Sequence, residues 1–204
     1  NPYKIVRMFE EEIANYTGAP YAVSVDSCTN ALFLACYYHK VAQVIIPSKT
    51  YLSVPQSIIH AGGEVIFDKR SYVNDWKGMY QLKPYPIWDA AKRLTKGMYK
   101  EGQTMCLSFH IKKLLPIWKG GMILTDDKKA YDWFRTVRYE GRSIDKDGVN
   151  YILYKDDPIK SMGWNMYMTP EQASRGLELL DNIKEDNPDQ ESSGTCKDLS
   201  QFEC

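Results

Sequence analysis

The stretch Thr104-Met-Cys-Leu-Ser-Phe-His-Ile-Lys-Lys-Leu-Leu-Pro-Ile-Trp-Lys-Gly-Gly-Met-Ile-Leu124 combines the signals for fold and for chemistry in this chain. Two β-type runs, Thr104–Phe109 and Gly121–Leu124, flank a polar segment that contains Lys112 and Lys113. A lysine just beyond a buried strand can lose its water, which disfavours the ammonium form and leaves a nucleophilic amine. A solvated loop explains the same two lysines, and this stretch alone does not decide between the two interpretations.

Upstream of this stretch, apolar runs of strand length alternate with apolar runs of helix length. Strands are expected at three places and helices at two places between them: Tyr21–Val25, Gln43–Ile46 and Glu64–Phe67 for the strands, Ala31–Tyr38 and Val54–Ala61 for the helices. This alternation predicts βαβ units, and therefore the α/β class with a mostly parallel sheet flanked by helices. An irregular segment follows, and a further strand is expected at Tyr85–Trp88.

Polar residues follow several of these strands at their carboxyl ends, where parallel sheets bind ligands. Ser27-Cys-Thr29 opens a helix whose free N–H groups could bind a phosphate, although plain N-capping explains the same residues. Tyr51 could stack on a planar ligand or simply pack. Asp89 is a candidate ligand anchor, with a surface or N-capping carboxylate as the alternative.

The chain divides by composition into a long patterned part and a short polar part. Residues 1–184 begin with the helix start Asn1-Pro2 and end with a helix opened by the capping box Thr169-Pro-Glu-Gln172. We expect them to form a single α/β domain. Residues 185–204 consist largely of Asp, Glu, Ser, Asn and Gln, with little to bury, and are expected to form a flexible tail.

The composition excludes several classes of protein. Twenty-six Lys and Arg balance twenty-six Asp and Glu among 204 residues, which argues against nucleic acid or an anionic membrane as the partner. No apolar run approaches the roughly 18 residues of a membrane span, and no signal-peptide pattern opens the chain. Five cysteines without a close CxxC pair predict no metal site and no disulfide framework, so the cytoplasm is the expected location.

Seven short blocks then occur in one order between residues 9 and 183: Phe9-Glu-x-x-Ile-Ala-x-Tyr-x-Gly18, Ser27-Cys-Thr-Asn-Ala-Leu32, Ile46-Pro-Ser-x-Thr-Tyr51, Asp89-Ala-Ala91, Ser108-Phe-His-x-x-Lys113, Gly120-Gly-Met122 and Gly163-x-Asn-x-x-Met-Thr169. Together they resemble the DegT/DnrJ/StrS family of sugar aminotransferases, which use pyridoxal phosphate. The resemblance implies the large domain of a fold-type-I transferase, reduced in size and without the small carboxyl-terminal domain.

The resemblance also implies a role for each matched residue. Lys113 matches the catalytic lysine that bonds to the cofactor aldehyde and then moves protons, and Lys112 is its solvent-facing neighbour. Asp89 matches the carboxylate that pairs with the pyridine nitrogen and keeps it protonated, so that the ring can accept electrons.

The other matched residues would bind the cofactor. Thr29, the backbone of Cys28 and Ser108 match the phosphate-binding residues at a helix start. Tyr51 matches the aromatic residue that stacks on the cofactor ring. Asn165 matches a residue that reaches the cofactor phosphate of the neighbouring subunit, so a homodimer is expected.

The family reaction moves an amino group, usually from L-glutamate, to a keto group of a nucleotide-linked sugar in two half-reactions. Four residues depart from the family pattern near the chemistry: Lys92, Trp118, Lys119 and Tyr167 stand where the family usually has Gln or His, Gly, Glu and Arg. They motivate an alternative, a non-catalytic or altered relative that acts as a binding or assembly module. A related sugar dehydratase would have histidine in place of Lys113.

Overall fold

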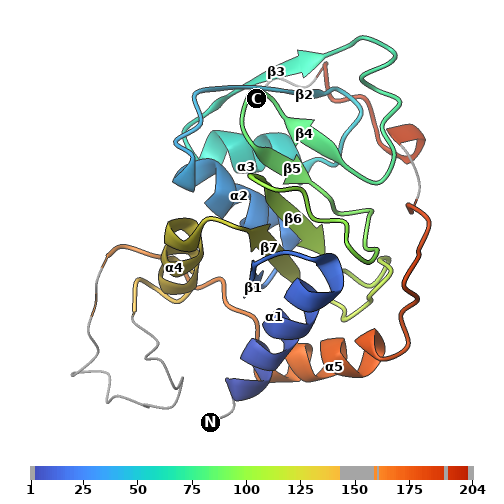
Figure 1. Ribbon diagram of the computed structural model, residues 1–204. Coiled ribbons are helices and arrows are strands. Elements are labelled where there is room, and N and C mark those ends of the chain that lie inside the picture. Colours follow the sequence, from blue (N-terminus) through green and yellow to red (C-terminus); the bar gives the residue numbers. More distant parts are fainter. Residues whose placement is uncertain (1–2, 143–158, 160, 191–192, 202–204) are drawn as a thin grey trace.

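The computed structural model describes residues 3–142, 159, 161–190 and 193–201 (Figure 1). Its main sheet has five strands in the order β1-β7-β6-β5-β4, and a separate parallel pair is formed by β2 and β3. The bounds are Tyr21–Val25 for β1, Gln43–Pro47 for β2, Glu64–Asp68 for β3, Tyr80–Leu82 for β4, Ile87–Asp89 for β5, Thr104–Ser108 for β6 and Gly121–Thr125 for β7. Two backbone hydrogen bonds between Ile45 and Lys83, of 2.8 and 3.1 Å, join β2 to the end of β4.

The α/β class is confirmed, but the sheet is mixed rather than mostly parallel. Strand β5 pairs with β6 in parallel, whereas β1 with β7, β6 with β7 and β4 with β5 are antiparallel. Parallel neighbours need a long crossover, usually a helix. The chain returns from β6 to β7 through a loop without a helix, and from β4 to β5 through a short turn, so both pairs are antiparallel.

Helices cover both faces of the main sheet. Their bounds are Lys4–Thr17 for α1, Cys28–Tyr38 for α2, Ser53–His60 for α3, Lys128–Val137 for α4 and Pro170–Leu180 for α5. Alternate residues of a strand point to opposite faces. Cys106 and Ile123 therefore pack with α2, α3 and α4, whereas Met105 and Leu124 pack with α1 and α5.

The helix ends match the sequence signals where they lie in the described part of the chain. Helix α1 ends at Gly18, whose φ of 77° lies in the left-handed region. The capping box at the start of α5 is present, with Thr169 and Gln172 each accepting from the other's backbone N–H. The expected helix start at Asn1-Pro2 lies outside the described residues. Helices α1 and α5 lie side by side (Figure 1), so close that a Cβ on Gly176 would be 2.6 Å from the Phe9 ring.

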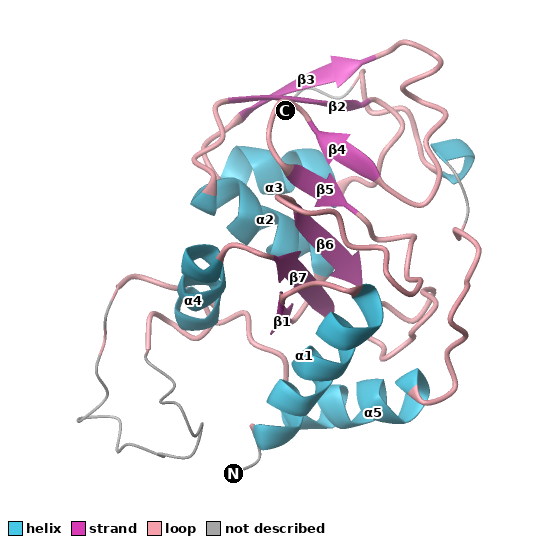
Figure 2. Cartoon of the chain, in the orientation of Figure 1, coloured by secondary structure: helices cyan, strands magenta, loops and turns pink. Residues whose placement is uncertain are grey.

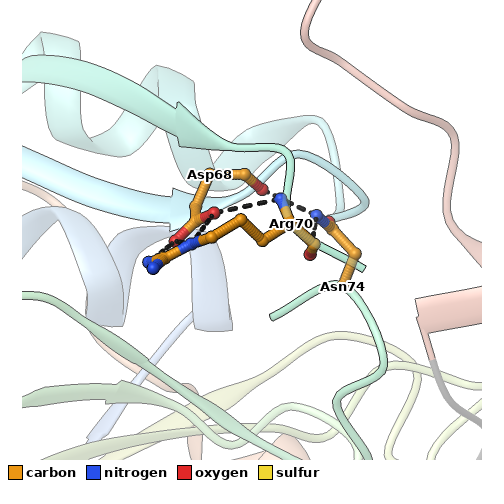
Figure 3. Close-up of polar contacts among 3 residues, drawn as sticks. All are labelled: Asp68, Arg70 and Asn74. Atoms are coloured by element: carbon orange, nitrogen blue, oxygen red, sulfur yellow. Dashed lines mark hydrogen bonds and ion pairs between the residues drawn. The ribbon is translucent and has the colours of Figure 1, made fainter. Parts of the chain in front are cut away.

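Asn74 organises the short connection from β3 to β4. Its side chain is buried, and its amide nitrogen donates to the carbonyls of Asp68 and Arg70 at 2.6 and 3.1 Å (Figure 3). Its amide oxygen accepts from the backbone N–H of Lys49 at 2.8 Å and from the Ser48 hydroxyl at 3.3 Å. One side chain thereby ties this connection to the end of β2.

The described residues 185–190 and 193–201 of the expected flexible tail contact the rest of the chain. The guanidinium of Arg93 donates to Asp189 at 2.6 Å, and the backbone N–H of Leu199 donates to Ser48 at 2.9 Å. Leu199 is buried, and a 3-10 helix spans Ser193–Thr195. In Figure 2 the chain after α5 runs as a loop along one side of the sheet. Hydrogen bonds from polar side chains hold this segment, so its low apolar content did not reveal its order.

Among the described residues, no helix is both long enough and apolar enough to cross a membrane.

Candidate active site

A cavity of about 670 Å³ lies at the edge of the main sheet where β5 and β6 end and α2 begins. Strands β1, β5 and β6 all run in the same direction, because β7 reverses between β6 and β1. Their carboxyl ends therefore meet at one edge. Six of the seven residues singled out from the sequence line the cavity: Cys28, Thr29, Tyr51, Asp89, Ser108 and Lys113.

Asp89 is the buried carboxylate of this cavity, with 6% of its surface exposed. The Tyr80 hydroxyl donates to its Oδ2 at 2.9 Å, and the backbone N–H of Ala91 donates to its Oδ1 at 3.0 Å. Burial raises the pKa of Asp89, and the two hydrogen bonds and the ammonium groups of Lys113 and Lys92 oppose this rise. The carboxyl is thus held in one orientation and lies within the field of Lys113.

Tyr80 orients Asp89 and was not singled out from the sequence. Its hydroxyl also bonds to the Thr50 hydroxyl, and its ring centroid is 4.8 Å from that of Trp76, which lines the cavity. Burial raises the pKa of Tyr80 well above its usual value, so the phenol keeps its proton for Asp89. The strand carrying Tyr80 is three residues long, which is too short for a periodic signal.

The start of α2 has an N-cap and two backbone N–H groups without an acceptor among the described residues. The Ser27 hydroxyl caps the helix by accepting from the backbone N–H of Asn30 at 3.2 Å. The backbone N–H groups of Cys28 and Thr29 make no hydrogen bond to another described residue. A Cβ on Gly121 would lie 2.6 Å from the Cys28 nitrogen, so only glycine allows β7 to begin this close to the helix. The N-capping interpretation is therefore confirmed for Ser27, and the anion site at Cys28 and Thr29 stays a prediction.

The two lysines of the loop after β6 differ in exposure. Lys113 is half-buried and Lys112 is exposed. The backbone N–H of Lys113 donates to the His110 carbonyl at 2.8 Å, which turns the chain back toward the cavity. Burial raises the pKa of the Cys28 thiol well above its usual value, and the Lys113 ammonium opposes this rise. The Lys113 charge is therefore close enough to act on both Cys28 and Asp89.

The carboxyl-terminal segment supplies part of the cavity wall, which the sequence did not indicate. Gln190, Thr195 and Cys196 line the cavity. The Lys92 ammonium donates to the Thr195 hydroxyl at 2.7 Å and lies 5.3 Å from the centroid of the Trp76 ring.

Two residues singled out from the sequence lie at or beyond the margin of the cavity. Tyr51 lines it but is 70% exposed. Asn165 is not among the lining residues, and its amide nitrogen donates to the Glu140 carboxylate at 3.2 Å. Within the described residues, no group of three or more His, Cys, Asp or Glu is placed to hold a metal ion.

The model of the DegT/DnrJ/EryC1/StrS aminotransferase family matches residues 1–74 and 89–196. The chain belongs to this family. It is 26% identical to the spore coat polysaccharide biosynthesis protein SpsC of Bacillus subtilis, over 87% of this chain and 57% of that protein. It is 25% identical to GDP-perosamine synthase of Caulobacter vibrioides, over 87% of this chain and 56% of the synthase.

The fold agrees with solved structures. The crystal structure of DesI with its TDP-sugar product matches with a TM-score of 0.66 and 22% identity, over 88% of this chain and 53% of DesI. This chain spans a little more than half the length of these relatives.

The gap in the family match contains two of the missed residues. Residues 75–88 lie between the two matched ranges, and they include Trp76 and Tyr80. The family pattern therefore carries no signal for Trp76 and Tyr80, whereas Gln190, Thr195 and Cys196 lie inside the matched range 89–196.

Proposed function

We propose that this family member is a pyridoxal-phosphate-dependent aminotransferase that moves an amino group from an amino acid, L-glutamate, to a keto group of a nucleotide-linked sugar. One observation carries the proposal: a half-buried lysine, a buried oriented carboxylate and an unfilled set of helix N–H groups line the same cavity. Amine, acid and anion site are the three groups that such a cofactor needs from a protein.

The donor set fits pyridoxal phosphate. The backbone N–H groups of Cys28 and Thr29, which have no acceptor among the described residues, would hold its phosphate together with the Ser108 hydroxyl. Asp89 would accept from the ring nitrogen, and Tyr51 would cover the ring. When bound, the cofactor supplies an electron sink for the carbon that loses its proton.

The residues of this chain would then divide the work. Lys113 Nζ would hold and move the proton at the substrate carbon, because Lys113 lines the cavity with Asp89 and is the half-buried one of the two loop lysines. Tyr80 and Ala91 would keep Asp89 aimed at the ring nitrogen through their hydrogen bonds of 2.9 and 3.0 Å. Leu32 and Val54 line the cavity as apolar wall and would exclude water from the reacting groups.

The substrate class and the assembly rest on relatives. The GDP-perosamine synthase and the DesI complex carry nucleotide sugars in their names, which supports such a substrate for this chain. A homodimer is part of the proposal, with Asn165 contributing to the site of the neighbouring subunit. The proposal includes no nucleic acid, membrane or metal.

An absorbance titration with pyridoxal phosphate, followed by addition of L-glutamate, tests the function. We expect the wild type to show a spectral change at each step. Lys112→Ala is the matched control and should behave as the wild type, because Lys112 lines the cavity with an exposed side chain and has no role in the proposed chemistry. Lys113→Ala should lose both changes. If wild type and Lys113→Ala give the same spectra, the catalytic assignment is wrong.

The same titration separates the alternative function. The alternative is favoured by the departures from the family pattern at Lys92, Trp118, Lys119 and Tyr167. It predicts a Lys113-dependent change with the cofactor and no further change with L-glutamate or with other amino donors.

A further inference from the structure

The charged residues that line the cavity are mainly cationic. Lys92, Lys112, Lys113 and Lys119 line it, with Asp89 as the one carboxylate among the described lining residues. Fields of one sign in a cleft concentrate ligands of the opposite sign. The cavity therefore favours an anionic ligand. Lys119 lines the cavity but has no role in the chemistry proposed above.

The backbone at Lys119 is fixed although its side chain is exposed. The Lys119 carbonyl accepts from the side-chain amide of Gln172 at 2.9 Å, and the oxygen of that amide caps α5 by accepting from the backbone N–H of Thr169 at 2.8 Å. The next carbonyl, of Gly120, accepts from the backbone N–H of Phe109 at 2.9 Å. The side chain of Lys119 is 65% exposed, so it can change partner without moving the chain.

The ammonium of Lys119 lies beside the start of α2. Its Nζ is 3.3 Å from Oδ2 of Asp26, the residue directly before the N-cap. The other oxygen of Asp26 accepts from the amide nitrogen of Asn30 at 2.6 Å and from the Ser27 hydroxyl at 3.1 Å. Lys119 thus pairs with the oxygen of Asp26 that does not accept from Ser27 or Asn30.

This carboxylate would repel an anion that approaches the open N–H groups of Cys28 and Thr29, since like charges a few ångströms apart oppose each other. Lys119 offsets that repulsion. We propose that Lys119 is a phosphate-binding residue, whose ammonium pairs with a phosphate group of the ligand above the start of α2 while Asp26 keeps it in place. The inference rests on the proposed function and adds a residue that departs from the family pattern.

Two ligands could supply the phosphate group: the cofactor, or the diphosphate of a nucleotide sugar. Equilibrium dialysis distinguishes them. The first arm compares pyridoxal phosphate with pyridoxal in the Lys113→Ala background, where binding needs no covalent bond. The second arm measures UDP, GDP and TDP binding to the protein loaded with pyridoxal phosphate.

We expect Lys119→Gln to weaken the binding of one of these ligands about fivefold, which is the effect of losing an exposed ion pair. If Lys119 contacts the cofactor, the substitution weakens the binding of pyridoxal phosphate and leaves the binding of pyridoxal unchanged. If Lys119 contacts the substrate, only the binding of the nucleoside diphosphate is weakened. Lys119→Arg should restore binding, and Lys129→Gln, which removes an exposed charge away from the cavity, should have no effect.

The inference is overturned if Lys119→Gln leaves the binding of every ligand unchanged, or if it weakens the binding of pyridoxal as much as that of pyridoxal phosphate. The failure of the proposed function looks different. It appears as a wild type without any Lys113-dependent absorbance change, whatever the dialysis shows.

Discussion

The hydroxyl of Tyr80 offers the sharpest test of how the buried carboxylate is held. Tyr80→Phe keeps the ring beside Trp76 and removes the 2.9 Å hydrogen bond to Asp89. A hydrogen bond to a charged group contributes about 1.5–3 kcal/mol. We therefore expect the free energy of unfolding to fall by about this amount at a pH where the Asp89 carboxylate is ionised.

The loss of stability in Tyr80→Phe should depend on pH in a defined direction. Burial raises the pKa of folded Asp89, so the folded state binds more protons than the unfolded state between the two pKa values. Stability therefore decreases as the pH rises from the unfolded pKa through the folded one. Removing the Tyr80 hydroxyl raises the pKa of folded Asp89 further. The difference in free energy of unfolding between wild type and Tyr80→Phe should therefore widen toward neutral pH and narrow in acid.

A double-mutant cycle isolates this contact from the others that Tyr80 makes. Urea unfolding of wild type, Tyr80→Phe, Asp89→Asn and the double variant gives the coupling energy, measured across a series of pH values. Thr50→Val is the control for the second bond of the hydroxyl. A coupling below about 0.5 kcal/mol, or one that stays constant with pH, would refute the reasoning.

Two further substitutions test the close approach at α2 and the connection after β3. Gly121→Ala places a Cβ 2.4 Å from the backbone carbonyl carbon of Ser27, so urea unfolding should show a loss of stability of about 1–3 kcal/mol, together with weaker binding of pyridoxal phosphate. In the control Gly120→Ala, the added Cβ meets the ends of flexible side chains, so the loss should be smaller. Equal losses in the two variants would contradict this reasoning. Asn74→Ala removes four hydrogen bonds and leaves the Lys49 N–H without its acceptor, so we expect the free energy of unfolding to fall by about 2–4 kcal/mol. The control Asn182→Ala changes an exposed residue and should alter stability little. Similar values for both variants would argue against Asn74 as the residue that organises the connection.

The part of the site that could be predicted follows from one rule of sheet geometry. Asp89 and Ser108 end adjacent strands, and Cys28 follows a strand that runs in the same direction, so their meeting at one edge was predictable from chain order. The exposure of Lys112 and the lower exposure of Lys113 agree with the assignment made from the sequence, although the catalytic role itself stays a prediction.

The remainder depends on contacts that leave no local pattern. The direction of β7 is set by the loop that precedes it, which has no helical period to signal a return. Tyr80 belongs to a strand too short to show alternation. The backbone N–H of Leu199, a buried residue, bonds to Ser48, which lies more than a hundred residues away, so the polar composition around Leu199 gave no sign of this contact.

The wall formed by the carboxyl-terminal segment has a consequence for synthesis. Thr195 contacts Lys92 across a separation of 103 residues, whereas the amine, the carboxylate and the helix start all lie within the first 113 residues. A ribosome therefore completes the chemical groups of the cavity long before it releases the segment that closes their side. A chain cut before Gln190 would therefore keep the amine, the carboxylate and the helix start, while its cavity would lose the wall that Gln190, Thr195 and Cys196 supply.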